Sequence, residues 1–451
     1  MFKRVLIANR GEIAVRVIRA LHELGVEAVA VYSTADRGAL HARLADRAVC
    51  IGPPPAAQSY LHIPSVIAAA RTTGCEAIHP GYGFLAENPG FVRACADNDV
   101  VFVGPDADVM ARMGDKVQAK AELARAEVPV VPGTEGPTTL WEARAVADEL
   151  GYPVLLKAVV GGGGKGMRLV HTPDELEGAF STASAEALAA FGDGILYLEK
   201  ALVPARHVEV QVLADGVGGV LTLGERECSI QRRHQKLVEE SPSPALTPEV
   251  REEMEAAAER ACRAIDYRNA GTFEFLLGPD GSFYFIELNA RLQVEHPVSE
   301  VVAGVDLVRE QIRIAAGERL SHTGRAPRRG HAIEIRLNAE DPTRDFAPAP
   351  GRVERFRAPL GPGVRVDTHL EDGAEVPPYY DSLLAKLIVW DADRPAAIAR
   401  GLRALGELVL DGVPSTREFA RQILRSEPFV SGNYSTLTLV DEQRRFAVAA
   451  R

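Results

Sequence analysis

Short apolar runs alternate with helical patterns through the first hundred residues, and this order leaves few folds open. The runs are RVLIA, EAVAVYS, RAVCIG, EAIHPG and VVFVGP, and segments such as GEIAVRVIRALHELG lie between them. Strands that alternate with helices build a parallel sheet, because each connection must cross over the sheet before the next strand begins. We therefore expect an N-terminal α/β domain. Its first strand-to-helix turn, ANRGEIA, lacks the G-x-G-x-x-G spacing, which argues against a dinucleotide at that turn.

The length and the charge of the chain narrow its class. Its 451 residues, 46% of them hydrophobic, can build two or three cores, because single cores stop growing at about 250–300 residues. The net charge of -11 argues against a general binder of nucleic acid or anionic membranes, which needs a basic surface. No run of eighteen apolar residues occurs, and MFKRVLIANRGE has no signal-peptide pattern. We expect a cytoplasmic, multidomain protein.

Cysteine usage points to neither a disulfide framework nor a zinc site. The five cysteines are odd in number and show no C-x-x-C spacing. We expect four of them to be small buried residues and leave Cys228 open because of its polar neighbours.

A run of glycines between two apolar strands, YPVLLKAVVGGGGKGMRLV, predicts a loop that closes over an anion. Gly161, Gly163 and Gly166 formally satisfy G-x-G-x-x-G, but a strand follows them where a dinucleotide site needs a helix. Walker A also fails, because Val159 replaces its first glycine and Gly166 follows Lys165. Glycine N–H groups can surround an anion and move as a lid. A mobile linker is the other interpretation; the short, strand-flanked loop with its lysine disfavours it.

Lysines are scarce, which makes their positions informative. Only eight of the 51 basic residues are lysine. Five of them stand beside glycines, strand ends or clustered polar residues: Lys116, Lys157, Lys165, Lys200 and Lys236. Lysine is a compact point charge and a common phosphate binder, so this clustering predicts a polyphosphate ligand.

The segment GTFEFLLGPDGSFYFIELN predicts a hairpin that carries hard metal ligands. A turn at residues 279–281 with an even loop length places Glu274 on the same face as Glu287 and Asn289. Two carboxylates and an amide oxygen suit Mg²⁺, which takes few protein ligands and completes its shell with phosphates and water. The alternative is a pair of strand glutamates that face water.

The stretch IELNARLQVEHP, residues 286–297, alternates polar and apolar residues, so we expect an extended strand whose polar face continues to Glu295. Arg291 offers paired donors to a planar oxyanion, and Glu295 could act as a base or orient that arginine. An ordinary half-buried strand would also alternate.

The basic run QRRHQK, residues 231–236, resembles a solvated loop or an RNA-contacting patch when taken alone. Acidic residues flank it on both sides, which favours a local anion pocket. His207, Glu209 and Gln211 likewise share one face of a predicted strand, where we expect an ordinary polar surface.

Ten segments, in order along almost the whole chain, resemble the biotin carboxylase component of acetyl-CoA and related acyl-CoA carboxylases, an ATP-grasp ligase. They include IANRGEIAVRV, IHPGYGFLAEN, KAVVGGGGKGMR, ERECSIQRRHQKLVEE, FIELNARLQVEHPVSE and GHAIEIRLNAEDP. The resemblance implies an α/β (α+β) ATP-grasp fold with a Rossmann-like N-terminal domain at 1–112. An ATP-grasp domain at 113–330, with a glycine-rich lid at about 131–203, and a C-terminal mixed α/β domain at 331–445 would follow.

The same resemblance implies that ATP and Mg²⁺ (or Mn²⁺) are bound. Residues implied to bind the nucleotide are Lys116, Lys157, Gly161, Gly162, Gly163, Gly164, Lys165, Gly166, Met167, Glu199, Lys200, Leu202, His207, Gln231, His234 and Leu276. Lys116, Lys157 and the glycine loop would hold the phosphates, and the backbone of 199–202 would meet adenine. Glu274, Glu287 and Asn289 would bind the metal.

The resemblance further implies that bicarbonate becomes carboxyphosphate and then carboxylates N1′ of biotin. The implied substrate residues are Lys236, Arg291, Gln293, Val294, Glu295, Arg336 and Tyr82. Among them Glu295 would deprotonate bicarbonate, and Arg336 would stabilise the enolate oxygen of biotin. Arg291 and Lys236 would complete the catalytic group.

Family resemblance also implies partners. The chain shows no Ala-Met-Lys-Met-type biotinylation motif, so we expect biotin to arrive on a biotin carboxyl carrier protein, with separate carboxyltransferase subunits and a homodimeric enzyme. A truncated piece of a longer carboxylase would look the same. The acceptor of the carboxyl group is not encoded here, because the carboxyltransferase selects it.

Two alternatives differ in class. Another ATP-grasp ligase, such as a carbamoyl-phosphate synthetase, would share the lid and the metal ligands, although RRHQK with RLQVEHP favours biotin carboxylase. A catalytically silent nucleotide-binding subunit would have no physical need for Glu295 beside Arg291.

Overall fold

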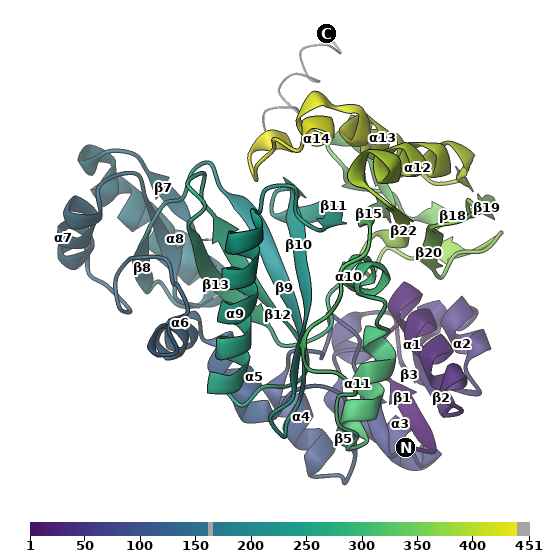
Figure 1. Cartoon of the computed structure of the whole chain (residues 1–451). Helices are drawn as coiled ribbons and strands as arrows, with labels where there is room; N and C mark the ends of the chain where they lie inside the picture. Colours follow the sequence, from purple (N-terminus) through teal and green to yellow (C-terminus); the bar gives the residue numbers. More distant parts are fainter. Residues whose placement is uncertain (161–165, 440–451) are drawn as a thin grey trace.

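The computed structural model of the chain describes residues 1–160 and 166–439 (Figure 1). Its N-terminal unit is built on a parallel sheet of five strands in the order β3-β2-β1-β4-β5. Their bounds, in that order, are Arg47–Gly52, Glu27–Ser33, Arg4–Ile7, Ala77–His79 and Val101–Phe102. The predicted α/β unit with a parallel sheet is confirmed.

Helices cover both faces of this sheet because its strands are apolar on both sides. The helices of this region are α1 (Gly11–Glu23), α2 (Leu40–Leu44), α3 (Ile63–Thr73), α4 (Pro89–Ala96), α5 (Ala107–Gly114) and α6 (Lys116–Arg125). Val5 and Ile7 of β1 share a core with α1, while Leu6 shares another with α3 and α4. The alternation of side chains along one strand thus assigns each helix to its face.

A small unit with three strands projects from the molecule, at the left of Figure 1. It contains α7 (Leu140–Leu150), β6 (Val154–Ala158), β7 (Arg168–Val170), α8 (Leu176–Phe191) and β8 (Leu196–Lys200), with the antiparallel order β7-β6-β8. Thr139 and Glu142 form a capping box at the start of α7. Gly161, Gly162, Gly163, Gly164 and Lys165 lie outside the described residues.

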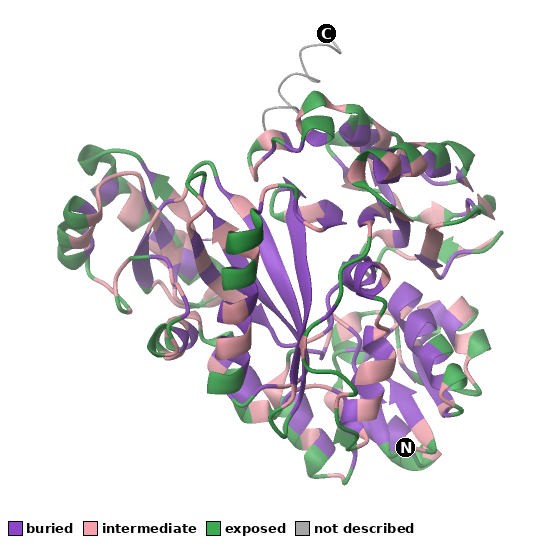
Figure 2. Ribbon diagram, viewed as in Figure 1, coloured by how far each residue is buried: buried purple, intermediate pink, exposed green. Residues whose placement is uncertain are grey.

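A second sheet of nine strands forms the centre of the molecule. Its path is β13-β12-β9-β10-β11-β15-β22-β20, with β14 beside β10. The bounds are β9 (Arg206–Asp215), β10 (Val220–Arg232), β11 (Gln235–Ser241), β12 (Arg268–Leu277), β13 (Phe283–Asn289), β14 (Gly324–Arg325), β15 (His331–Asn338), β20 (Val364–Thr368) and β22 (Leu383–Asp391). Because β11 pairs with β15, this sheet runs on across residue 330 without a break. Figure 2 shows β9 and β10 buried along nearly their whole length.

Six helices and several short strands complete the fold. The helices are α9 (Pro248–Ala264), α10 (His296–Ala303), α11 (Leu307–Ala315), α12 (Arg394–Glu407), α13 (Arg417–Arg425) and α14 (Glu427–Ser431). The short strands are β16 (Glu340–Asp341), β17 (Ala347–Pro348), β18 (Gly351–Arg352), β19 (Arg355–Arg357), β21 (Glu375–Val376) and β23 (Val409–Asp411). At the C-terminal end of the central sheet, α12 and α13 pack on one face of β15 and β22, and α10 packs on the other.

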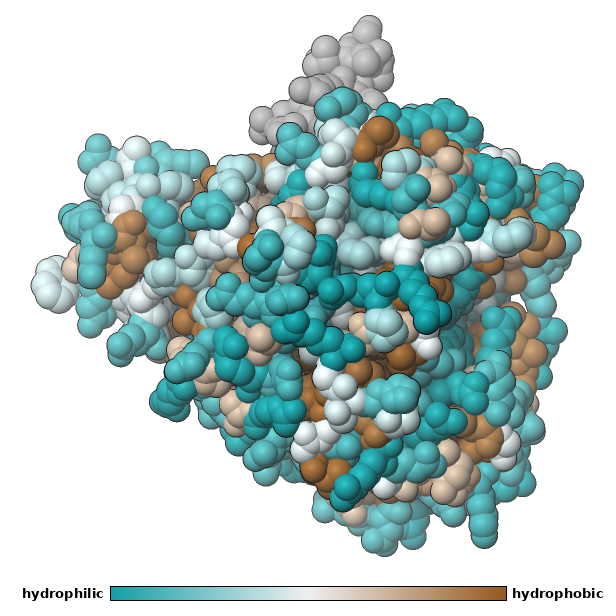
Figure 3. All heavy atoms as spheres, in the orientation of Figure 1, coloured by the Kyte–Doolittle hydropathy of each residue, from teal (hydrophilic) through white to brown (hydrophobic). Residues whose placement is uncertain are grey.

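The outer surface carries few large apolar side chains. Figure 3 shows mostly hydrophilic residues on the face in view, with small hydrophobic patches between them. None of the helices within the described residues is long and apolar enough to cross a bilayer. The cysteine prediction is wrong in one case: Cys50 is exposed on β3, the edge strand of its sheet, while Cys75, Cys95 and Cys262 are buried as expected.

Candidate active site

The acids of the β12–β13 hairpin face one another, as the sequence predicts. Glu274 is the direct cross-strand partner of Glu287. Asn289 stands two residues further along β13 and therefore on the same face. On the other side of β12, Glu209 of β9 pairs with Glu274. Oxygen-bearing side chains from three adjacent strands thus meet at the β13 end of the central sheet.

The expectation of an extended strand through Glu295 is wrong. β13 ends at Asn289, and α10 begins at His296. Pro297 lies in the first turn of α10, where its fixed φ suits a helix, and Glu295 precedes that helix with φ −79° and ψ 8°. Tertiary contacts still return this segment to the site, since Gln293 Nε2 donates to Glu274 Oε1 at 2.7 Å.

Lys236, near the start of β11, holds three carboxylates together. Its Nζ donates to Glu209 Oε2 at 2.6 Å, to Glu295 Oε1 at 2.6 Å and to Glu274 Oε1 at 3.0 Å. Burial alone would lower the pKa of Lys236, but these carboxylates outweigh burial and hold the pKa well above its usual value. Lys236 is therefore a cation throughout the physiological range, and it joins β9, β12 and the start of α10.

Glu295 is an anion shared by two cations. Its Oε1 accepts from Lys236, and its Oε2 accepts from Arg336 Nη2 at 2.9 Å. Burial would raise the pKa of this carboxyl, but Lys236, Arg336 and Arg226 together hold the pKa well below its usual range. Glu295 is thus unprotonated at neutral pH, which is the form a general base requires.

Arg226 lies at the centre of the site, although the sequence analysis does not single it out. Its fully buried guanidinium on β10 donates to five side chains: Glu209, Gln211, Thr272, Gln293 and Ser299. A buried guanidinium without such partners would be strongly destabilising. The signal that could have found it is the polar face of β9, where Glu209 and Gln211 alternate with valines. That face lies inside the molecule and is not the ordinary polar surface that the sequence suggests.

Arg336 connects the C-terminal end of the sheet to Glu295. Its Nε donates to Glu239 Oε1 at 2.6 Å, while Nη2 reaches Glu295. Burial would lower the pKa of Arg336, but the neighbouring carboxylates, Glu239 first, raise it. The guanidinium charge is therefore permanent, and two carboxylates fix its orientation.

Arg291 is anchored from the N-terminal unit. Its Nε donates to Glu87 Oε2 at 2.8 Å, and its Nη2 donates to Asn289 Oδ1 at 2.8 Å. Glu87 follows β4 in the chain and also accepts the backbone N–H of Ala290 at 3.0 Å. Nothing in the sequence around Glu87 indicates this role, because its partner lies about two hundred residues further along the chain.

A cavity of about 400 Å³ adjoins these groups. Four of the residues implied to contact bicarbonate or biotin line it: Tyr82, Arg291, Val294 and Arg336. Glu12 of α1 also lines the cavity, and its carboxyl group accepts a hydrogen bond from the hydroxyl of Tyr82. The structure thus brings Tyr82, from the N-terminal unit, to the same cavity as Arg336 from the C-terminal region.

On the lid side, Glu199 holds two lysines. Its carboxylate accepts from Lys120 Nζ at 2.5 Å and from Lys157 Nζ at 2.9 Å. Burial would lower the pKa of Lys157, but Glu199 raises it. Lys116, at the start of α6, lies 3.7 Å from Glu287. Lys120 is a further basic residue of this region that the sequence analysis misses, although it stands one helical turn after Lys116.

The other residues implied to bind the nucleotide are distributed along the same side. His207 Nδ1 contacts Gln231 Nε2 at 2.6 Å, and its Nε2 lies 2.7 Å from Glu274 Oε2. Leu276 is the cross-strand partner of His207. Of the remaining members, His234 is exposed at the β10–β11 turn, and Lys200 donates to the carbonyl of Gly151. Gly166 is buried, and Met167 and Leu202 are half-buried.

The side chains present fit a divalent cation. Glu274 and Glu287 stand opposite each other with an amide oxygen of Asn289 on the same face, and hard oxygen donors suit Mg²⁺. The Glu287 side chain is 41% exposed, and its ion-pair partner within residues 1–160 and 166–439, Lys116, is 3.7 Å away, which leaves room for a ligand. Glu274 is already occupied by Lys236 and His207, and these contacts would have to loosen for it to bind metal.

Cys228 is buried beside Glu209 and Glu295, with the three ligand atoms within 4.8 Å of one another. Burial, reinforced by these carboxylates, raises the pKa of the thiol well above its usual value. The thiol therefore stays protonated and is a poor nucleophile.

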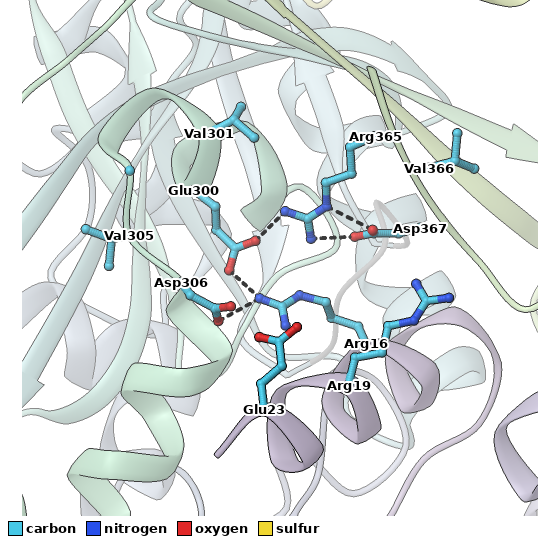
Figure 4. A pocket seen from close by; sticks show the side chains of 11 residues that line it. Arg16, Arg19, Glu23, Glu300, Val301, Val305, Asp306, Arg365, Val366 and Asp367 are labelled. Carbon is cyan, nitrogen blue, oxygen red and sulfur yellow. Dashed lines mark hydrogen bonds and ion pairs between the residues drawn. The ribbon is translucent and has the colours of Figure 1, made fainter. Parts of the chain in front are cut away.

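A second cavity, of about 430 Å³, opens between α1, α10 and β20 (Figure 4). Ion pairs cross its floor: Arg16 to Glu300 at 3.0 Å, Glu300 to Arg365 at 2.7 Å, and Arg365 to Asp367 at 2.7 Å. None of the sequence-predicted site residues lines it within the described chain.

Three family models match the chain in succession. They are described as the biotin carboxylase N-terminal domain (residues 1–110), the carbamoyl-phosphate synthase L chain ATP-binding domain (115–323) and the biotin carboxylase C-terminal domain (334–441). The middle model alone would leave a carbamoyl-phosphate synthetase open, but the flanking two are specific to biotin carboxylase.

Relatives and solved structures agree with this. Biotin carboxylase of Nostoc sp. is 55% identical over 96% of this chain and 98% of its own length. A pyruvate carboxylase subunit of Methanothermobacter thermautotrophicus is 53% identical over 99% of this chain and 91% of its own. The biotin carboxylase domain dimer of Hydrogenobacter thermophilus 2-oxoglutarate carboxylase, in complex with MgADP, ADP and bicarbonate, superimposes with a TM-score of 0.93. It is 47% identical, covering 98% of each chain.

Proposed function

The chain belongs to the biotin carboxylase family, and from that premise we propose a role for each group of its active site. The enzyme is an ATP-dependent ligase with an ATP-grasp fold. It uses MgATP to activate bicarbonate as carboxyphosphate and carboxylates biotin that a carrier supplies, with release of ADP and phosphate. The observation that carries the assignment of roles is the Glu295 carboxylate, held ionised between Lys236 and Arg336 beside the 400 Å³ cavity.

The nucleotide would lie between the lid and the central sheet. Lys116, Lys157 and the glycine loop at 161–166 would hold the phosphates, and residues 199–202 with His207 and Leu276 would surround the nucleoside. Lys116 and Lys157 support this role, because both point toward carboxylates on the faces that enclose this space. Glu274, Glu287 and Asn289 would hold Mg²⁺, which supplies positive charge to the phosphate oxygens.

Bicarbonate would bind among Lys236, Arg291, Gln293, the Val294 backbone and Glu295. Glu295 would remove its proton. In the free enzyme Glu295 is a weak base, because two cations stabilise its charge. A bicarbonate anion that draws Lys236 and Arg291 to itself would weaken those contacts and add a like charge nearby, and both effects raise the pKa of Glu295 toward the range a base needs.

Biotin would occupy the cavity beside Tyr82 and Arg336. As N1′ loses its proton, negative charge develops on the ureido oxygen, and the Arg336 guanidinium would stabilise it. Preorganised donors are effective in such sites, and Glu239 fixes the orientation of this one.

The domain bounds, the partner proteins, the acceptor and the cellular location are part of the same proposal. We assign the domains to 1–112, 113–330 and 331–445, and a biotin carboxyl carrier protein and carboxyltransferase subunits as partners. The carboxyltransferase would select the final acceptor, for which an acyl-CoA is one candidate. A keto acid such as pyruvate is the second candidate, supported by the pyruvate carboxylase relative described above. A cytoplasmic location is consistent with five free cysteines, one of them exposed.

ADP release from the purified chain tests the function directly. With MgATP present, release should require bicarbonate and should be strongly stimulated by free biotin, because carboxyphosphate is consumed only when biotin accepts its carboxyl group. Release that depends on bicarbonate but ignores biotin would indicate another carboxyphosphate-forming ligase. No turnover would indicate a silent nucleotide-binding subunit.

Glu295→Gln tests the base. Loss of a positioned base costs about 10²–10⁴-fold in rate, so biotin carboxylation should fall by that factor while the affinity for MgADP stays near that of the wild type. Glu407→Gln, at an exposed ion pair on α12, is the matched control and should turn over normally. Wild-type turnover of Glu295→Gln would rule out the assigned role.

Glu287→Gln tests the metal site. Without this carboxylate the affinity for nucleotide should lose much of its dependence on Mg²⁺, by about tenfold or more, judging from losses at metal sites generally. Calorimetric titration of ADP with and without Mg²⁺ measures this. Exposed Glu249→Gln serves as control, and an unaltered metal dependence in Glu287→Gln would contradict the assignment.

The homodimer is testable by sedimentation equilibrium. The Hydrogenobacter structure named above is a dimer of a chain that resembles this one over nearly its full length, so we expect a mass about twice the 48.5 kDa of one chain. A monomer at micromolar concentration would contradict the proposal.

A further inference from the structure

Glu334, on β15 below α10, is a buried acid whose role the reaction above leaves open. Its side chain is fully buried, and neither carboxyl oxygen has a hydrogen-bond partner within residues 1–160 and 166–439. Glu239 is its direct cross-strand partner, is also fully buried, and has one oxygen, Oε2, without a partner in the same ranges. Two carboxyl groups therefore lie side by side in the sheet with three unsatisfied oxygens between them.

The face that carries Glu334 is defined by the sheet register. Arg336 stands two residues along the same strand, and Lys386 of β22 is the cross-strand partner of Arg336. Helix α10 covers this face, since Val298 and Val302 pack against Ala332 and Ile388. The charged or titratable groups around Glu334 are thus Glu239 on β11, Arg336 on β15, Lys386 on β22, Glu295 before α10, and Tyr82. Beyond Lys386, and facing that lysine, lie Glu12 on α1, His296 on α10 and Asp367 on β20.

The nearby cations are already paired with other carboxylates. Arg336 donates to Glu239 and Glu295. Lys386 donates to the carbonyl of Val294 at 2.9 Å, and its Nζ lies 3.1 Å from Glu12. An ionised carboxylate buried without a hydrogen bond or a paired cation is strongly destabilising, whereas a protonated one is tolerated. The geometry therefore favours Glu334 as a neutral acid.

We propose that Glu334 carries a proton in the working enzyme and acts through Arg336, whose permanent positive charge stabilises the ureido oxygen of biotin in full only while no ionised Glu334 offsets it. This inference rests on the role of Arg336 proposed above. With Glu334 neutral, the guanidinium is oriented by Glu239 and Glu295 alone. An ionised Glu334, on the same face of the same strand, would add a third negative charge and offset the field that Arg336 presents to the ureido oxygen.

The pKa directions agree with this geometry. Burial, more than the opposing effect of Lys386, places the pKa of Glu334 well above its usual value, and Glu239 adds to the rise. Burial likewise raises the pKa of Glu239 to about 7. A carboxyl whose pKa is raised on folding binds a proton that the unfolded chain has released, so its contribution to stability decreases as pH rises from the unfolded pKa toward the folded one.

Glu334→Gln tests the proposal because glutamine has the shape of the neutral acid and cannot ionise. We expect the ratio of biotin-dependent turnover at alkaline pH to that at neutral pH to rise several-fold over wild type. We also expect the melting temperature of the variant to exceed that of wild type by an amount that grows with pH. Glu407→Gln, on the surface, should change neither quantity.

Infrared spectroscopy reads the proton directly. The wild-type protein at neutral pH should show a protonated-carboxyl C=O band that shifts in D₂O and is missing from the spectrum of Glu334→Gln. Absence of that band, or an unchanged pH profile in a folded Glu334→Gln variant, would overturn the proposal. Arg336→Met separates the two assignments: if it leaves biotin carboxylation intact, the role of Arg336 fails, while the infrared band still reports whether Glu334 holds a proton.

Discussion

The ion pairs of Lys236 are the interaction on which the rest of the active site depends. One ammonium group satisfies carboxylates from β9, β12 and the turn before α10, all of them almost fully buried. Three carboxylates without that cation would repel one another in a medium that screens charge poorly. Lys236, placed by β11, therefore offsets the repulsion among the three carboxylates that the β9–β12 pairing and the Glu295 turn bring together. Arg226 also connects these elements, because its guanidinium donates to Glu209 on β9 and to Gln293 before α10.

The continuous central sheet connects the residues around Lys236 to those of the C-terminal region, so that both contribute to one site. Because β11 pairs with β15, the strand that carries Arg336 is fixed relative to the strand that carries Lys236, although a hundred residues separate them in the chain. Lys386 of β22, fully buried, donates to the carbonyl of Val294 and contacts Glu12 of α1. Three parts of the chain thus meet at one cavity through hydrogen bonds to permanently charged groups, which leaves little freedom in their relative placement.

The sequence predicts the parts of this site that follow local periodicity. Alternation along β12 and β13 correctly places Glu274, Glu287 and Asn289 on one face. Alternation fails after Asn289, because a turn and a helix start can carry the same pattern as a strand. Arg226, Lys120 and Glu334 are missed for a different reason. Their significance lies in partners or neighbours far along the chain, and charged residues of these types are usually exposed.

The free enzyme keeps its base in a paired and weakly basic state, and this has a mechanistic consequence. A carboxylate stabilised by both Lys236 and Arg336 cannot take a proton readily, so the site is inert toward stray proton transfer until an anion competes for those cations. In the proposed mechanism bicarbonate is such an anion, and by drawing Lys236 toward itself it would make Glu295 a stronger base when the base is needed. Arg336 would keep its place meanwhile, because Glu239 holds its Nε and the residue already lines the cavity. Activation of the proposed base would thus come from the loss of its Lys236 contact, while the guanidinium proposed to stabilise biotin keeps its anchor on Glu239.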